Sequence, residues 1–468
     1  MKKHNLFKVV MITIIVCMLL SWVLPVSYMN GSELVENPVN KIGLFELANF
    51  SRDLFSAFGH ISLYVLAIGG LYGVLHKIGG YRNLLDKIVK GFKNYEYVFM
   101  AIVIVVFALL SGMVGLSLPL MVLFPFVISI ILLMGYDKIT AALVTAGSTA
   151  IGLIGSVFSV NNTYGIDMVL QGATAPDKNQ VEKILLLVIG VALLIFNVVL
   201  YSKKHKSNKE IEASDYVPEV TNKKSKSWPI VVVLDVMLVI LALAFFSWDL
   251  FGVEVFADWL KKVNEFEVFG IAIFDAIFGL SMPFGYWTLL EAAVLIFLIS
   301  WYISFLYRVK FNEFLTNFMN GAKRALKPAV LVMLIYFVLA ITYTNPTLLT
   351  LTRPILELTE GFNVITMAIV AIIVCVLSVE LFYGASTILP FVTGSLFTTL
   401  AAKEVMVLGL VWQSMNGVAM LFAPTSIVLI ATLAYLHVPY QKWLKAIWKL
   451  LLELFVILLI VLTILTLI

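Results

Sequence analysis

Long apolar runs alternate with short polar segments along most of this chain. A helix needs about 20 mostly apolar residues to cross the hydrocarbon core of a bilayer. Uninterrupted runs of about that length lie near residues 7–25, 58–76, 183–201, 229–247, 285–307, 328–350 and 446–467. The pattern therefore predicts an all-α polytopic membrane protein.

Further apolar segments are interrupted by glycine, proline and small polar residues. The interruptions fall at Ser111–Pro119, at Gly147–Thr163, at Glu380–Thr387 with Pro390 after it, and at Gln413–Gly417 with Pro424–Ser426 after it. In hydrocarbon, non-helical backbone is tolerated only where it is buried in protein or lines a polar cavity. We therefore expect two re-entrant hairpins, near 97–134 and 363–398, and two broken spans, near 139–165 and 405–436.

The basic residues predict the orientation of these elements. If both hairpins enter and leave on one side, most of the 32 Lys and Arg residues lie in the cytoplasm, with the N-terminus inside and the C-terminus outside. A full crossing at 97–134 would instead place the lysine-rich segment 202–228 outside. The first hairpin should therefore open from the inside and the second from the outside, which makes an inverted repeat.

The segment 202–228 is too polar for a bilayer and divides the chain. We expect a first transmembrane half over 1–201, a basic cytoplasmic linker over 202–228, and a second half over 229–468. The region 251–283 is ambiguous between a re-entrant and an interfacial segment.

Composition excludes several classes of protein. The chain is 61% hydrophobic and 13% charged, with a mean hydropathy of +1.02, which no soluble domain of this length shows. The net charge of +4 resides in loops and does not indicate nucleic-acid binding. The five histidines lie at loops or span ends, and the chain contains no HExxH motif, so we expect no enzyme activity.

The interruptions supply the candidate site. Free helix N-termini suit a carboxylate, and unwound carbonyls with Ser, Thr or Asn oxygens suit a sodium ion. The expected substrate- or ion-binding residues are Ser117, Asn161, Asn162, Thr163, Glu380, Ser386, Thr387, Asn416, Thr425 and Ser426. Na⁺, the one cofactor considered, is expected at Ser117, Asn161, Ser386 and Asn416. The alternative is that these side chains only cap helix ends or pack between helices.

A carboxylate deep in an apolar segment is costly and usually functional. Glu380 follows such a run, so it is a candidate proton or substrate-amine site; the alternative is a structural pairing. The pattern favours a secondary active transporter of the cytoplasmic membrane for a small organic solute (an amino acid, small peptide or carboxylate), coupled to Na⁺ or H⁺ or by exchange. A sodium/proton antiporter that uses Glu380 is the alternative.

Several segments resemble the YfcC-type family of proposed basic amino acid antiporters, within the ion transporter superfamily. The resemblance is carried by Leu66–Gly79, Gly152–Ser156, Pro283–Ala292, Asn320–Lys323, Pro424–Ser426 and Val438–Trp443. It implies a scaffold domain, a transport domain with two hairpins, elevator-like movement and a homodimer. The chain departs from the family where a substrate would bind: Gly115 and Leu116 replace an acidic pair, and Phe382–Ser386 replaces a Pro-Ser-Gly-Ser tip.

Overall fold

The computed structural model describes residues 5–31, 33–172, 175, 178–206, 216–217, 225–278, 282–397 and 399–467. Within these ranges, the side chains of residues 160, 161, 250, 277 and 278 are not described. Eight described helices are long and apolar enough to cross a membrane. They are α1 (Asn5–Val23), α2 (Leu44–Leu75), α4 (Glu96–Leu109) with its π-helical end η1 (Leu110–Val114), α9 (Gln180–Lys204), α11 (Trp228–Phe245), α14 (Leu289–Leu306), α15 (Phe311–Thr344) and α21 (Tyr440–Leu467).

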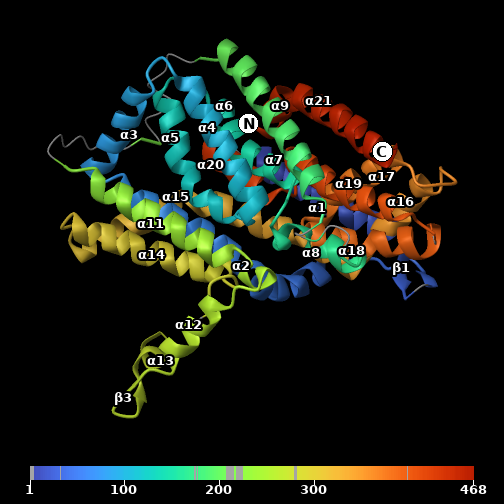
Figure 1. Cartoon of the computed structure of the whole chain (residues 1–468), viewed down its shortest axis with the longest axis horizontal. Coiled ribbons are helices and arrows are strands. Elements are labelled where there is room, and N and C mark those ends of the chain that lie inside the picture. The colour runs from blue at the N-terminus through green and yellow to red at the C-terminus, as the bar shows by residue number, and fades with distance from the viewer. Residues whose placement is uncertain are drawn as a thin grey trace.

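Helices α2, α11, α14 and α15 lie side by side in one layer (Figure 1). At the centre of this layer α2 and α15 cross closely, because Gly69 and Gly73 face Gly321. A Cβ on Gly73 would collide with the carbonyl of Asn317, and a Cβ on Gly321 would collide with that of Gly69. Small residues at such spacing let membrane helices pack backbone to backbone. This contact joins the two halves of the chain.

The segment near 97–134 folds back on itself. It consists of α4 and η1, a bend in which Gly115 has φ 82°, the 3₁₀ turn η2 (Pro119–Leu123), and α5 (Phe124–Leu133). The rings of Tyr97 and Tyr136, at its two ends, are 6.1 Å apart between centroids. Both ends therefore lie together, and the bend at Gly115 lies at the opposite end.

The segment near 363–398 has the same form. Helices α17 (Val364–Ser378) and α18 (Leu381–Phe391), extended by η5 (Val392–Leu396), meet at Val379 and Glu380, where Val379 has φ 65°. A Cβ on Gly384 would lie 2.7 Å from Ser378 Oγ, so the arms pack closely. The expected interruption at Glu380–Thr387 is therefore too long: only Val379 and Glu380 leave the helix.

Two further segments are broken helices. The first comprises α6 (Lys138–Ala142), η3 (Leu143–Gly147) and α7 (Ser148–Ile154), then non-helical residues 155–159, then α8 (Val160–Val169). The second comprises α19 (Ala402–Met420), non-helical residues 421–426 and α20 (Ile427–Leu436). The expected interruption at Gln413–Gly417 is wrong, because α19 runs through it, and Gly147 lies inside a continuous helical stretch.

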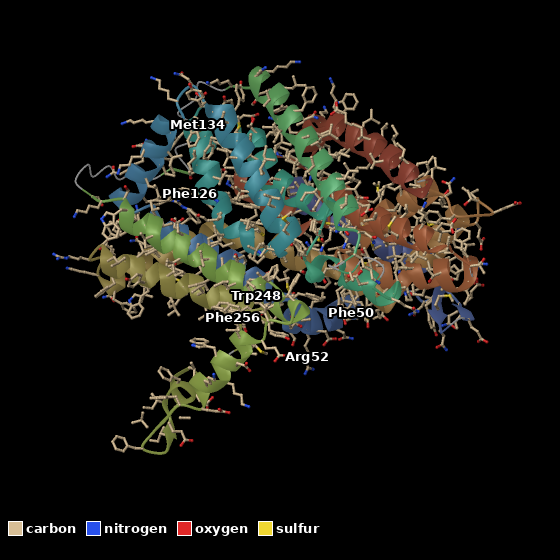
Figure 2. All side chains as sticks on the ribbon, viewed as in Figure 1. Phe50, Arg52, Phe126, Met134, Trp248 and Phe256 are labelled. Atoms are coloured by element: carbon tan, nitrogen blue, oxygen red, sulfur yellow. The ribbon has the colours of Figure 1, made fainter. Side chains whose placement is uncertain are left out.

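The remaining elements lie around these bodies. They are α3 (Gly79–Gly91), α16 (Leu348–Leu356), the hairpin of β1 (Val26–Asn30) and β2 (Glu33–Asn37), and an arm made of η4 (Trp248–Phe251), α12 (Val255–Asn264), β3 (Glu267–Val268), β4 (Ile271–Ala272) and α13 (Ile273–Phe278). The arm covers most of the ambiguous region 251–283 and projects away from the other helices (Figure 1). At its base Trp248 and Phe256 lie close together, with ring centroids 5.1 Å apart (Figure 2). The chain is thus mostly, and not wholly, helical.

Candidate functional site

The bend after α4 contacts the first helix break directly. The backbone N–H of Val157 donates to the carbonyl of Gly112 at 3.0 Å, and Ser111 Oγ donates to the carbonyl of Thr149 at 2.8 Å. A Cβ on Gly112 would lie 2.5 Å from the carbonyl oxygen of Gly152. Two facing glycines therefore allow the bend and the break to share backbone hydrogen bonds.

A group of polar side chains, which we name the serine–amide cluster, consists of Ser111, Ser156, Asn162 and Gln413. Asn162 Nδ2 donates to the carbonyl of Ser111 at 3.1 Å and to Ser156 Oγ at 3.0 Å. Gln413 Nε2, from α19, donates to the carbonyl of Ser156 at 3.1 Å. The cluster therefore joins the first hairpin, the first break and a helix of the second half.

Two polar atoms, one in this cluster and one in the first break, lack hydrogen-bond partners among the described residues. They are Oε1 of Gln413 and Oγ of Ser159, and both are buried. An unpaired buried polar group costs about 1–3 kcal/mol. Such atoms are candidates for binding a ligand that completes their hydrogen bonds.

The second break is tied to the second hairpin. Thr425 Oγ1 donates to the carbonyl of Val376 in α17 at 2.6 Å, and Ser426 directly precedes α20. In the same hairpin, the buried Ser378 Oγ has no hydrogen-bond partner within the described part of the chain. The second half therefore repeats the arrangement of the first, with a hairpin bonded to a helix break and a buried hydroxyl left unpaired.

The two halves of this arrangement touch. A Cβ on Gly417 of α19 would lie 2.7 Å from the backbone nitrogen of Ile154, the last residue of α7. Helix α8, after the first break, packs on α18 of the second hairpin, where the rings of Tyr164 and Phe382 stack at 5.8 Å. Helices α8 and α20 each begin directly after a break, so their first N–H groups and positive dipole ends face the broken region.

Glu380 links the second hairpin to α15. The phenol of Tyr336 donates to Glu380 Oε1 at 3.0 Å, and its ring, fully buried, stacks on Phe58 at 4.0 Å. Glu380 therefore has one neutral hydrogen-bond donor, which suits either protonation state of a carboxyl group.

The predicted site residues do not all lie together in the structure. Asn162 belongs to the serine–amide cluster, and Thr163 Oγ1 donates to Asp167 Oδ2 at 2.8 Å. Ser117 is half-buried in the first bend, while Asn416 is buried within α19. The side chain of Asn161 lies outside the described residues.

Ser386 and Thr387 were predicted to lie at the second bend. The structure places both residues inside α18 instead. Both hydroxyls donate to the carbonyl of Tyr383, at 3.2 and 2.7 Å. Their oxygens retain lone pairs, so they could still hold a cation from the surface of α18. Within the two breaks, the described hydroxyl oxygens belong to Ser156, Ser159, Thr425 and Ser426, and the expected Na⁺ site stays a prediction.

Sequence reasoning missed Ser111, Ser156, Gln413 and Tyr336 as individual site residues. Ser111 and Gln413 stood at the edges of predicted interruptions, and that position was a usable signal. Tyr336 lies in an ordinary apolar run, and no local pattern distinguishes it from a packing residue.

A cavity of about 710 Å³ lies apart from these residues, between α2 and α15 on one side and α5 and α20 on the other. Among the described residues, its lining includes none of the predicted site residues and no member of the serine–amide cluster.

Comparison with known proteins shows what this chain is similar to. The chain is 23% identical over 407 residues to YfcC of Escherichia coli (strain K12), named as a proposed basic amino acid antiporter; the match covers 82% of this chain and 73% of YfcC. The crystal structure of the YdaH transporter from Alcanivorax borkumensis is 14% identical, with 97% of this chain and 98% of that chain covered and a TM-score of 0.44.

A family model spans almost the whole chain, from residue 4 to residue 467, and describes a C4-dicarboxylate anaerobic carrier. This family and the relatives are carriers and not enzymes, and the apolar helices agree with a multi-pass membrane protein. The chain therefore belongs to the DcuC family of membrane carriers.

Proposed function

We propose that this protein is a secondary active carrier that moves a C4-dicarboxylate across the cytoplasmic membrane. The observation that carries the proposal is the paired construction of the two breaks. Each break precedes a helix N-terminus, is hydrogen-bonded to a hairpin, and lies near a buried hydroxyl without a partner among the described residues. Helix N-termini bind carboxylates without a basic side chain, and two such ends match a solute with two carboxylates.

The hairpins suit a re-entrant, elevator-like carrier. The two ends of the first hairpin lie together at Tyr97 and Tyr136, which supports entry and exit on one side of the membrane. The layer of α2, α11, α14 and α15 is the natural scaffold, because the glycine contact between α2 and α15 fixes both halves to each other. The hairpins and broken helices form the moving body, and a homodimer would immobilise the scaffold.

Glu380 is the proposed coupling residue. A carboxylate at the second bend would repel a dianionic solute, so solute binding favours the protonated form of Glu380. Tyr336 can hydrogen-bond that carboxyl group in either state. Coupling to H⁺ follows from this pair, and coupling to Na⁺ through the oxygens at the breaks is the competing mechanism.

The test is uptake of radiolabelled succinate into proteoliposomes that contain the full chain, with pH and Na⁺ gradients imposed separately. We expect uptake driven by an inward proton gradient, and Glu380→Gln should retain exchange of internal for external succinate while it loses stimulation by the proton gradient. The absence of uptake and exchange of succinate, fumarate and malate would refute a dicarboxylate carrier. Stimulation by Na⁺ alone, unchanged in Glu380→Gln, would refute the proton mechanism.

Antiport of a basic amino acid is the second candidate, and Glu380 is the observation that favours it. A carboxylate at the bend could pair with a cationic side chain, as the name of YfcC suggests for that relative. The same proteoliposomes separate the two: arginine–arginine exchange that fails in Glu380→Gln would favour the antiporter.

A further inference from the structure

The cavity described above is lined by residues from both halves of the chain. Its walls come from α2, α15, α5 and α20, with Tyr216 and Val217 from the segment between the two halves. Its volume of about 710 Å³ is that of an ordinary ligand pocket, since such pockets range from about 300 to 1,000 Å³. The cavity is therefore large enough for a small organic anion.

The charged side chains on its walls have one sign: Lys77, after the end of α2, and Arg324, on α15, line the cavity. The imidazoles of His76 and His437 line it as well. Among the described residues, no Asp or Glu does so. Clefts lined by one sign of charge concentrate ions of the opposite sign. The amide groups of Asn317 and Asn320 add neutral hydrogen-bonding partners.

His76 adds an unpaired polar atom to this lining. Its Nε2 is buried and has no hydrogen-bond partner among the described residues. An imidazole nitrogen, which can donate or accept a hydrogen bond, is therefore available to a ligand at this point.

The cavity is separate from the site at the helix breaks, but two of its lining residues come from elements that follow a bend or a break. Met121 lies in η2, which follows the first bend, and Ala431 lies in the middle of α20, the helix that follows the second break. Lys77 and Arg324 are exposed at the surface of the structure.

We propose that this cavity is an anion-binding antechamber, in which Lys77 and Arg324 bind a small carboxylate or phosphate dianion before or after it occupies the site at the breaks. The identification of the anion as the transported dicarboxylate rests on the proposed function. The anion-binding property itself does not, because it depends only on the charge and volume of the cavity. The same chemistry would accept the phosphate of an anionic lipid.

The experiment is protection of a cysteine placed in the cavity. Asn320 lines the cavity and is exposed, while the native Cys17 and Cys375 are buried. The full chain with Asn320→Cys, in nanodiscs of phosphatidylcholine, is labelled with a neutral methanethiosulfonate reagent, and the parent chain serves as the blank. An anion present at ten times its Kd leaves about a tenth of the sites free, so labelling should slow roughly tenfold.

Charge variants test whether the protection arises in the cavity. Arg324→Gln and Lys77→Gln, each combined with Asn320→Cys, should remove most of the protection by succinate or inorganic phosphate. Lys90→Gln is the matched control, because Lys90 is at the end of α3 and does not line the cavity. Two separate charge variants are used so that a folding defect in one, detected by size-exclusion elution, leaves the other informative.

The outcomes separate the sources of the anion. Protection by succinate in phosphatidylcholine nanodiscs supports a soluble anion, and protection without added anion in phosphatidylglycerol nanodiscs supports a lipid headgroup. No protection by any of these anions, or protection that persists in both charge variants, overturns the antechamber. If uptake of dicarboxylates fails while protection by phosphate remains, the proposed function is wrong and the anion site stands.

Discussion

Replacement of Asn162 by alanine tests the candidate site most directly. The Asn162 amide makes two hydrogen bonds, to the carbonyl of Ser111 and to Ser156 Oγ, and these hold the first bend against the first break. Each neutral hydrogen bond contributes about 0.5–1.5 kcal/mol net, so the free energy that holds the bend against the break should decrease by roughly 1–3 kcal/mol in the variant. If the substrate-bound state loses this stabilisation and the free protein does not, kcat/KM for uptake should decrease about 5- to 150-fold.

The assay is the initial rate of succinate uptake, with equal amounts of protein confirmed in each preparation. Asn312→Ala is the control: Asn312 is exposed near the start of α15, and it should keep the wild-type rate. Asn162→Asp sharpens the test, because a carboxylate cannot donate to the Ser111 carbonyl and would repel an anionic solute. We expect Asn162→Asp to be slower than Asn162→Ala. Wild-type uptake in both variants would refute the assignment of this cluster to the site.

Further predictions concern packing, the second break and the first hairpin. Gly417→Ala should destabilise the protein by about 1–3 kcal/mol and lower its Tm, because the new methyl would overlap Ile154, whereas Gly394→Ala, with open space around it, should not. Thr425→Val removes the hydrogen bond to α17, and we expect uptake to fall by about tenfold while the elution profile is unchanged. Cysteines at Tyr97 and Tyr136 should be labelled from the same side of the membrane; labelling from opposite sides would eliminate the re-entrant assignment.

The crossing helices were predictable because the bilayer demands length and apolarity, and both are visible in the sequence. The two helix breaks were predictable in outline for the same reason, since glycine, proline and hydroxyl residues are conspicuous in an apolar run. The arm within 251–283 was not, because its segments are short and polar enough to suit several environments.

The predicted boundaries of the breaks were wrong where polar side chains have hydrogen-bond partners that the sequence does not show. The residues around Gln413 remain helical because its amide bonds to the carbonyl of Ser156 and Ser414 Oγ bonds back to Leu410 within α19. In the same way, Ser386 and Thr387 bond to the carbonyl one turn earlier. A polar residue in an apolar run therefore does not by itself mark a break, because its partner can be a carbonyl of its own helix or a group on a neighbouring element.

The cavity could not be predicted from the sequence for a different reason. Lys77, Arg324 and His437 are far apart in the sequence, and no local pattern distinguishes them from ordinary basic residues. Only the crossing of α2 with α15, and the position of α20 beside them, brings these side chains together.

The glycine crossing of α2 and α15 has a consequence for how the two halves of the chain assemble. Each half contributes one of the two helices that pack against each other, so neither half can bury this glycine contact alone. The covalent connection between α9 and α11 raises the effective concentration of one half near the other. Two polypeptides, divided between those helices and synthesised in the same cell, should find each other and assemble.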